Sequence, residues 1–347
     1  MSALACEHLV VGGGLLGLST ADHLLRRGAR GVHLLERRGG PNAGRPGEPG
    51  VVLRSGHPSL AEIEARGRTL LESPEEVLGV DLPFRRAGSL RIPADLPIPP
   101  GCEHLAEEQL AARFPGLLAP GAAARFAPSD GTLETLPLLA ALHARLRAQG
   151  GRLVVDAELL ELREEEDAVH FTAAGRSGRA GRVHLAAGAE NLRFLPALGC
   201  RHHWRSEVVH TFHLFTPRES GAALWLPESR AALAPLGGGE WELEIAVDAE
   251  PGARGEPSVD WTLLERFRGE HAGPIPWLGE TQVRRARVLP RLAFAPEETI
   301  LVSRLGRIAA AGAFGVHGLA LHSAVAEAMA ERALAPLAAA GGMLEEG

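Results

Sequence analysis

The chain has 347 residues, of which 45% are hydrophobic, and this length and composition predict a globular protein of two domains. The 36 basic residues are outnumbered by 43 acidic ones, so the net charge of −7 leaves no basic excess for binding nucleic acid. Three widely separated cysteines and the lack of a long apolar run argue against a disulfide framework and a membrane span, and we expect a cytoplasmic protein.

The N-terminal segment predicts a strand, a helix and a second strand. Cys6–Val11 is a short apolar strand that leads straight into a glycine loop, which is not the pattern of a signal peptide. Leu15–Leu25 has apolar residues on one helical face and is followed by Gly28, a typical helix stop. Val32–Leu35 is the second strand and completes a βαβ unit.

Helices and strands continue along the remainder of the chain. We expect helices over Leu60–Leu78, Glu107–Phe114, Leu136–Gln149 and Leu319–Leu334. We expect strands over Arg152–Val155, Ala168–Thr172, Arg182–Ala187, Val208–Phe215, Trp241–Val247 and Arg307–Ala311.

This order of elements predicts an α/β fold class with two interleaved domains. Residues 1–80, 132–200 and 295–347 have the pattern of a Rossmann-like, βαβ dinucleotide-binding domain. Residues 81–131 and 201–294 have the pattern of an antiparallel-sheet α+β domain inserted in two pieces.

The first glycine loop has the GxGxxG spacing between a strand and a helix. Gly12 permits a tight turn, Gly14 lets the backbone approach a pyrophosphate, and Gly17 lets the helix pack against the strand. The helix that starts at Leu15 then offers free N–H groups to the phosphates. Glu36, at the end of the second strand, can accept hydrogen bonds from ribose hydroxyls and would repel a 2′-phosphate.

A second glycine loop lies near the C-terminus. It contains Gly312, Gly315 and Gly318 and opens a long helix at Leu319. Backbone N–H groups and the positive end of the helix dipole would stabilise negative charge at this loop. His317 lies in the same loop and is a candidate catalytic residue.

Five segments, in this order over nearly the whole chain, resemble the family of D-amino-acid oxidase, glycine oxidase and sarcosine oxidase. They are Val10–Arg37, Gly79–Leu90, Asp130–Thr132, His184–Ala189 and Gly312–Leu319, of which the first and the last are the most specific. The resemblance implies that the dinucleotide is FAD and that the α+β domain binds the substrate.

The resemblance also assigns further positions around FAD. Arg37 matches the basic residue that follows the ribose-binding acid, and the backbone of Leu159 matches a contact to adenine. Ala187 and Gly188 match a second turn against the cofactor. Gly44 and Arg54 belong to a loop expected beside the pyrophosphate and the flavin ring.

The sequence departs from the family where the substrate carboxylate is usually bound. Members use an Arg directly before a proline, because a guanidinium binds a carboxylate with two hydrogen bonds, but Leu289 occupies that place here. Arg287, Arg291 or Arg54 can take over this role. The alternatives are a substrate without that carboxylate, or a chain that has lost its original chemistry.

Other family features are absent from the sequence. It contains no Lys and no Tyr, which several relatives use near the flavin. No Cys follows Cys200, so FAD should be bound non-covalently, although attachment through a His stays open. His210 and His213 are expected on opposite faces of one strand and do not predict a metal site.

The resemblance implies oxidation of a C–N bond in a small amine or amino-acid-like substrate, with hydride transfer to flavin N5. Oxygen or another electron acceptor would reoxidise the flavin. Three alternatives stay open: a flavin-dependent dehydrogenase of a hydroxy compound, a flavin-binding protein without turnover that acts as the subunit of a partner, and an NAD-dependent dehydrogenase. The last conflicts with the flavin-like C-terminal loop.

Overall fold

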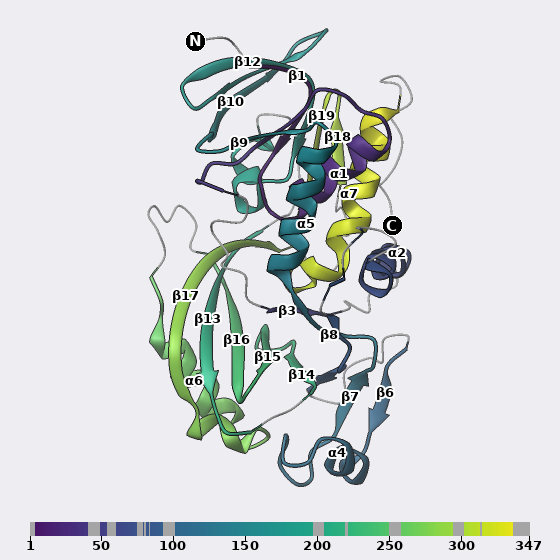
Figure 1. Ribbon diagram of the computed structural model, residues 1–347. Coiled ribbons are helices and arrows are strands. Elements are labelled where there is room, and N and C mark those ends of the chain that lie inside the picture. Colours follow the sequence, from purple (N-terminus) through teal and green to yellow (C-terminus); the bar gives the residue numbers. More distant parts are fainter. Residues whose placement is uncertain are drawn as a thin grey trace.

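The computed structural model contains two eight-stranded sheets, a small third sheet and six α-helices among the residues that it describes (Figure 1). These residues are 4–40, 49–53, 60–74, 79, 81–82, 84–92, 101–196, 205–218, 221–249, 258–293, 302–312 and 314–335. No helix of this part of the chain is long and apolar enough to cross a membrane.

The first sheet has a parallel centre. Its strands are β1 (Leu4–Val11), β2 (Val32–Leu35), β9 (Arg152–Val154), β10 (Leu159–Glu164), β11 (Val169–Ala173), β12 (Arg176–Leu185), β18 (Val302–Leu305) and β19 (Ile308–Ala311). The order β10-β11-β12-β1-β2-β9 runs across the sheet, and β19 also pairs with β12. β12, β1, β2 and β9 are parallel, as are β12 and β19, whereas β10, β11 and β12 form an antiparallel meander.

Both faces of the centre of this sheet are buried. The helices are α1 (Leu15–Arg26), α2 (Ala61–Glu72), α5 (Thr135–Ala148) and α7 (Gly318–Leu334), and α1, α5 and α7 lie together beside the sheet in Figure 1. Val10 of β1 packs in one apolar cluster with Leu18 of α1 and Leu142 of α5. Its neighbours Leu9 and Val11 belong to a cluster on the other face, as the alternation of side chains along a strand requires.

The second sheet is mostly antiparallel and has the order β17-β13-β16-β15-β14-β5-β7-β6. Its strands are β5 (Ser89–Arg91), β6 (Glu103–Leu105), β7 (Ala124–Ala127), β13 (Arg205–Phe215), β14 (Ala223–Leu226), β15 (Ala231–Gly237), β16 (Glu240–Asp248) and β17 (Gln282–Ala293). Its core face packs against α4 (Glu107–Arg113), α6 (Trp261–His271) and the 3-10 helix η4 (Pro276–Glu280). The fully buried rings of Trp241 and Trp277 lie 4.7 Å apart in this core.

A three-stranded sheet lies between the two large sheets in Figure 1. It consists of β3 (Pro49–Val52), β8 (Gly131–Glu134) and β4 (Phe84–Arg85). Leu53, directly after β3, is fully buried in a cluster with Ala223, Ala232 and Ala234 of the second sheet. Because of this contact, one face of the second sheet points toward β3 and the start of α7.

Candidate active site

The GxGxxG loop follows β1 and needs its glycines for space. Gly12 has a φ of +109°, and a Cβ there would lie 2.4 Å from the carbonyl oxygen of Ala186. A Cβ on Gly17 would lie 1.8 Å from the carbonyl oxygen of Gly12. The loop is therefore pressed against the end of β12 on one side and against α1 on the other, as the motif predicts.

The beginning of α1 is open to an anion. Gly14 is the N-cap residue, no side chain caps the helix, and the first turn has no acidic residue. A Cβ on Gly14 would meet nothing within 4 Å, so free space adjoins the unpaired N–H groups that begin at Leu15. This arrangement fits a pyrophosphate.

Glu36 is anchored beside the same loop. Its carboxylate accepts hydrogen bonds from the backbone N–H of Gly13 at 2.8 Å and from that of Arg38 at 2.9 Å. Arg37 forms an ion pair of 3.0 Å with Glu190, which belongs to the 3-10 helix η2 (Gly188–Arg193) after β12. The ends of β2 and β12 are thus tied together across the loop.

The turn after β12 depends on a residue that the sequence did not single out. Asn191 is fully buried and accepts a hydrogen bond from the N–H of Ala187 at 3.0 Å. Its amide donates to the carbonyl oxygens of Leu185 at 3.2 Å and Ala311 at 2.9 Å, joining the ends of β12 and β19. Gly188, with a φ of +61°, adjoins free space. The available signal was the rarity of asparagine, because the chain has only two.

Leu159 is the first residue of β10 and is 3% exposed. Its side chain packs in the cluster that contains Leu35, at the end of β2. Its predicted backbone contact to adenine stays a prediction.

The C-terminal loop follows β19. Gly312 is buried, Gly315 has a φ of +53° beside free space, and residues Gly315–His317 form the 3-10 helix η5. α7 begins at Gly318 with no side-chain cap and no acid in its first turn, while Leu319 packs against the core. A second uncapped helix end is therefore available to negative charge.

These loops share one edge of the first sheet. They follow β2, β1, β12 and β19, which are parallel and adjacent, so their carboxyl ends meet. Ligands of open parallel sheets bind at this edge. The glycine openings and the two helix ends fit an extended dinucleotide that has phosphates near α1 and a ring near α7.

His317 faces the second sheet. Its Nδ1 lies 3.0 Å from the carbonyl oxygen of Leu53, and its ring meets that of Trp225 edge-on at 6.2 Å. Burial lowers the pKa of His317 to about 4, and the charges of Arg91 and Arg291 lower it as well, although the bond to Leu53 acts in the opposite direction. Because a carbonyl only accepts, the neutral ring carries its proton on Nδ1 and has a lone pair on Nε2.

The face of the second sheet toward His317 is ionic. Arg287 pairs in register with Thr211 and donates to Glu242 at 3.0 Å. Arg291 pairs in register with Glu207 and donates through Nε to this carboxylate at 3.2 Å and through Nη1 to Glu244 at 3.2 Å.

Leu289 lies between Arg287 and Arg291 on the same face, because successive side chains of β17 alternate. The structure therefore brings two of the three predicted arginines to the face toward His317. Arg54 and Gly44 lie outside the described residues, so their roles stay predictions.

The histidines of β13 have ordinary partners. Nδ1 of His210 accepts from the N–H of Asp260 at 3.2 Å, and His213 lies 3.2 Å from Glu242. Within the part of the chain that the structure describes, no group of three His, Cys, Asp or Glu residues could hold a metal ion.

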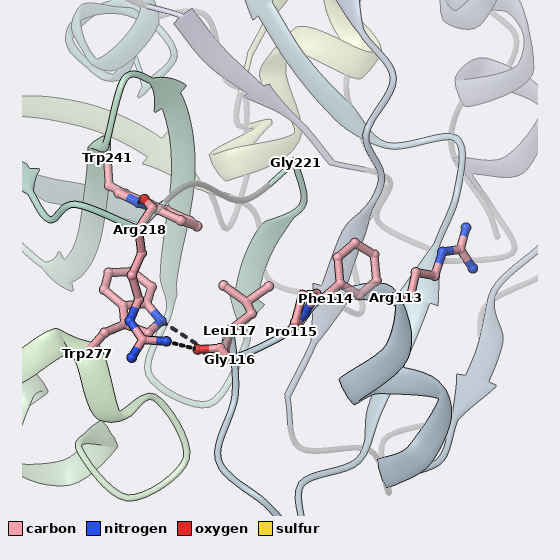
Figure 2. A pocket seen from close by; sticks show the side chains of 9 residues that line it. All are labelled: Arg113, Phe114, Pro115, Gly116, Leu117, Arg218, Gly221, Trp241 and Trp277. Atoms are coloured by element: carbon pink, nitrogen blue, oxygen red, sulfur yellow. Dashed lines mark hydrogen bonds between the residues drawn. The ribbon is translucent and has the colours of Figure 1, made fainter.

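A separate cavity of about 320 Å³ lies beside Trp241 and Trp277 (Figure 2). Trp277 donates to the carbonyl oxygen of Leu117 at 2.9 Å, and Arg218 donates to that of Gly116 at 2.7 Å. None of the predicted site residues that the structure describes lines this cavity.

The fold and the glycine edge are those of an α/β dinucleotide-binding protein, with a second sheet over this edge. The chain matches the family described as FAD dependent oxidoreductase over residues 7–332 and belongs to it. The protein is thus an FAD-dependent oxidoreductase, and the family and cofactor predicted from the sequence are confirmed.

Several solved structures share the fold. A mutant of NikD, an unusual amino acid oxidase essential for nikkomycin biosynthesis, has a TM-score of 0.78 at 18% identity, over 99% of this chain and 96% of that chain. L-proline dehydrogenase from P. horikoshii has a TM-score of 0.78 at 18% identity, over 95% of this chain and 93% of that chain. Glycine oxidase from Geobacillus kaustophilus has a TM-score of 0.78 at 17% identity, over 99% of this chain and 100% of that chain. No curated protein matches the sequence.

Proposed function

We propose that the protein oxidises a C–N bond of a small amino-acid-like substrate whose carboxylate binds Arg291. The observation that carries the proposal is the placement of Arg291, whose guanidinium is held by Glu207 and Glu244 on the face of the second sheet toward His317. Its charge also lowers the pKa of His317. The similar folds of an amino acid oxidase, a glycine oxidase and a proline dehydrogenase support this substrate class.

The reaction removes two electrons and two protons from the substrate. The C–N single bond becomes C=N as the α-carbon loses a hydride and the nitrogen loses a proton, and water then releases the carbonyl product and ammonia or an amine. FAD, when bound, supplies the hydride acceptor, and oxygen or another acceptor takes the electrons from it. Arg291 holds the substrate so that the α-carbon stays in one place.

His317 would contribute a neutral hydrogen-bond acceptor. Its Nδ1 proton is committed to Leu53, so Nε2 can accept a hydrogen bond from the substrate amine. This contact orients the amine, which loses a hydride from its α-carbon in its uncharged form.

The same proposal includes the predicted domain division and the contacts to FAD. All strands of the first sheet come from residues 1–80, 132–200 and 295–347, and all strands of the second from 81–131 and 201–294, which supports the division. FAD would be bound non-covalently. Heat denaturation and desalting test this point, since colour that stays with the polypeptide contradicts it.

Ammonia release from a panel of amino acids, amines and hydroxy acids tests the function. We expect amino acids to release ammonia, and Arg291→Gln to raise KM by about 10-fold or more, since a lost charged hydrogen bond costs about 1.5–3 kcal/mol. Arg287→Gln is the matched variant on the same strand, and its effect should be smaller. Bleaching of the flavin by hydroxy acids, with no ammonia released from any amino acid, would contradict the proposal.

A further inference from the structure

The carboxylate of Glu207 occupies an unfavourable place in the second sheet. It is 3% exposed and lies directly across from Asp248 in the pairing of β13 with β16. Like charges in opposite cross-strand positions destabilise a sheet, and a buried carboxylate needs partners. A chain selected for stability alone would not require this arrangement.

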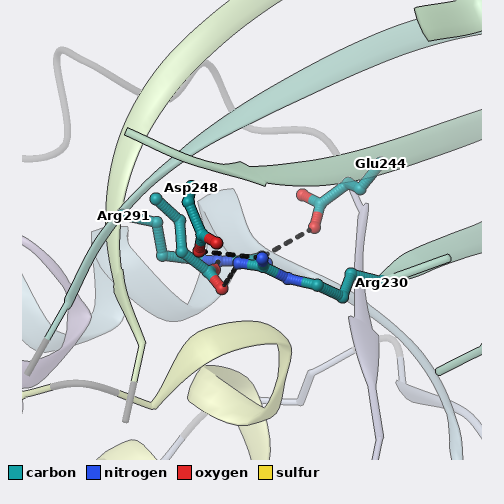
Figure 3. A network of polar contacts seen from close by, with 5 residues as sticks. Arg230, Glu244, Asp248 and Arg291 are labelled. Atoms are coloured by element: carbon teal, nitrogen blue, oxygen red, sulfur yellow. Dashed lines mark hydrogen bonds and ion pairs between the residues drawn. The ribbon is translucent and has the colours of Figure 1, made fainter. Parts of the chain in front are cut away.

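Arg230 bridges the two acids. It forms ion pairs with Glu207 and, at 2.9 Å, with Asp248, whose side chain is 63% exposed (Figure 3). Its φ of +48° is a left-handed conformation that residues other than glycine rarely adopt. Strained residues persist only where surrounding contacts hold them, and they concentrate at functional sites.

The other oxygen of Glu207 holds Arg291. Nε of Arg291 donates to this oxygen at 3.2 Å, and its Nη1 donates to Glu244 at 3.2 Å. The guanidinium is thus fixed from two sides, while these contacts leave Nη2 of Arg291 for a ligand. A guanidinium held in advance loses less conformational freedom when it binds a carboxylate.

We propose that Glu207 is the positioning residue of the substrate site, and that Asp248, Arg230 and Glu207 form an ionic chain that orients Arg291 for a carboxylate. The proposal rests on the proposed role of Arg291. Glu207 does not touch the substrate, so its loss should affect binding more than the chemical step.

Binding of propionate to the FAD-loaded protein, measured by calorimetry, tests the chain. We expect Glu207→Gln to weaken the Kd by roughly 10-fold or more, as loss of a supporting contact commonly does at ligand sites. KM for the amino-acid substrate should rise by a similar factor, with kcat changed less than about threefold. Glu240→Gln, an exposed glutamate of β16, is the matched control and should bind like the wild type.

A double-mutant cycle separates positioning from general damage. If Glu207 acts through Arg291, Glu207→Gln should add no further weakening in the Arg291→Gln background. Equal weakening in both backgrounds would overturn the proposal. If Glu207→Gln does not fold, Arg230→Gly replaces it, because glycine accepts the left-handed φ. This variant should also weaken propionate binding, and wild-type affinity would overturn the proposal.

The two proposals fail differently. If the wild type does not bind propionate, or binds it as well after Arg291→Gln, Arg291 is not the carboxylate anchor and both proposals fall. If Arg291→Gln weakens binding while Glu207→Gln leaves it unchanged, only the positioning role of Glu207 is wrong.

Discussion

At the scale of single residues, the GxGxxG loop depends on the absence of a Cβ atom at its glycines. Gly17 faces the backbone of Gly12, which cannot move aside as a flexible side chain could. The GxGxxG motif could be predicted from sequence because each glycine answers a local steric need. Asn191 could not, because its partners Leu185 and Ala311 come together only in the folded sheet.

Gly17→Ala should therefore weaken FAD binding. Forcing a methyl group into a filled space costs about 1–3 kcal/mol, and here α1 must shift away from the phosphate site. Titration of the apoprotein with FAD, followed by flavin fluorescence, measures the loss. Gly269→Ala in α6 is the control, because a Cβ there meets nothing within 4 Å. Unchanged FAD affinity for Gly17→Ala would contradict this role.

His317 has a pH signature of its own. Its pKa of about 4 keeps the ring neutral at all higher pH values. The profile of kcat/KM against pH should then show no ionisation of His317 near the ordinary value of 6.5. Comparison with His317→Gln checks this, and a limb near 6.5 that disappears in the variant would show that the ring titrates there.

At the scale of elements, the regular apolar patterns gave correct predictions. The strands β1 and β2 and the helices α1 and α5 lie within two residues of their expected bounds. α6 was not predicted, because its sequence is mainly polar. Its N-cap is Asp260, whose carboxylate accepts a hydrogen bond from the N–H of Thr262 at 2.9 Å. α2 ends at Glu72, whereas the predicted helix runs to Leu78, and residues 75–78 of that range lie outside the described residues.

β17 shows why the ionic face of the second sheet was hard to predict from the sequence. Its face toward His317 carries Arg287 and Arg291 on either side of Leu289, so it has no apolar alternation, and the acids that pair with the arginines lie on β13 and β16. Pro290 is compatible with the strand because β17 is at the edge of the sheet. Charges that become partners only after folding leave no local pattern.

α7 makes the fold sensitive to acid. Burial lowers the pKa of His322 to about 4, as it does for His317 at the helix N-cap, from an ordinary value of 6.5. The unfolded chain therefore binds more protons than the native one between pH 6.5 and 4, so stability is lost as the pH falls through this window.

Each of these two histidines should lower the free energy of unfolding at pH 5 by about 2 kcal/mol relative to its value at pH 7.5. Urea unfolding at pH 7.5 and 5 measures this loss for the wild type and for His322→Gln. The variant should lose less stability on acidification, because it lacks one of the two groups. An equal loss in both proteins would show that His322 does not contribute.

At the scale of the whole molecule, the two large sheets contribute different features to the candidate active site. The first sheet brings the glycine turns and two uncapped helix ends to one edge, where they suit FAD. The second turns its ionic face toward that edge, through the contact of Leu53 with Ala232 and that of His317 with Trp225. The family could be predicted from the sequence because its motifs are local, whereas the ionic face of the second sheet is assembled from distant strands.

The most direct test of this account is anaerobic mixing of the FAD-loaded protein with amino acids, amines and hydroxy acids while the visible absorbance of the flavin is recorded. We predict that amino acids bleach the flavin, and that Arg291→Gln needs a much higher amino-acid concentration for the same bleaching. Bleaching by hydroxy acids only, or by no member of the panel, would contradict oxidation of a carboxylate-bearing C–N substrate at this site.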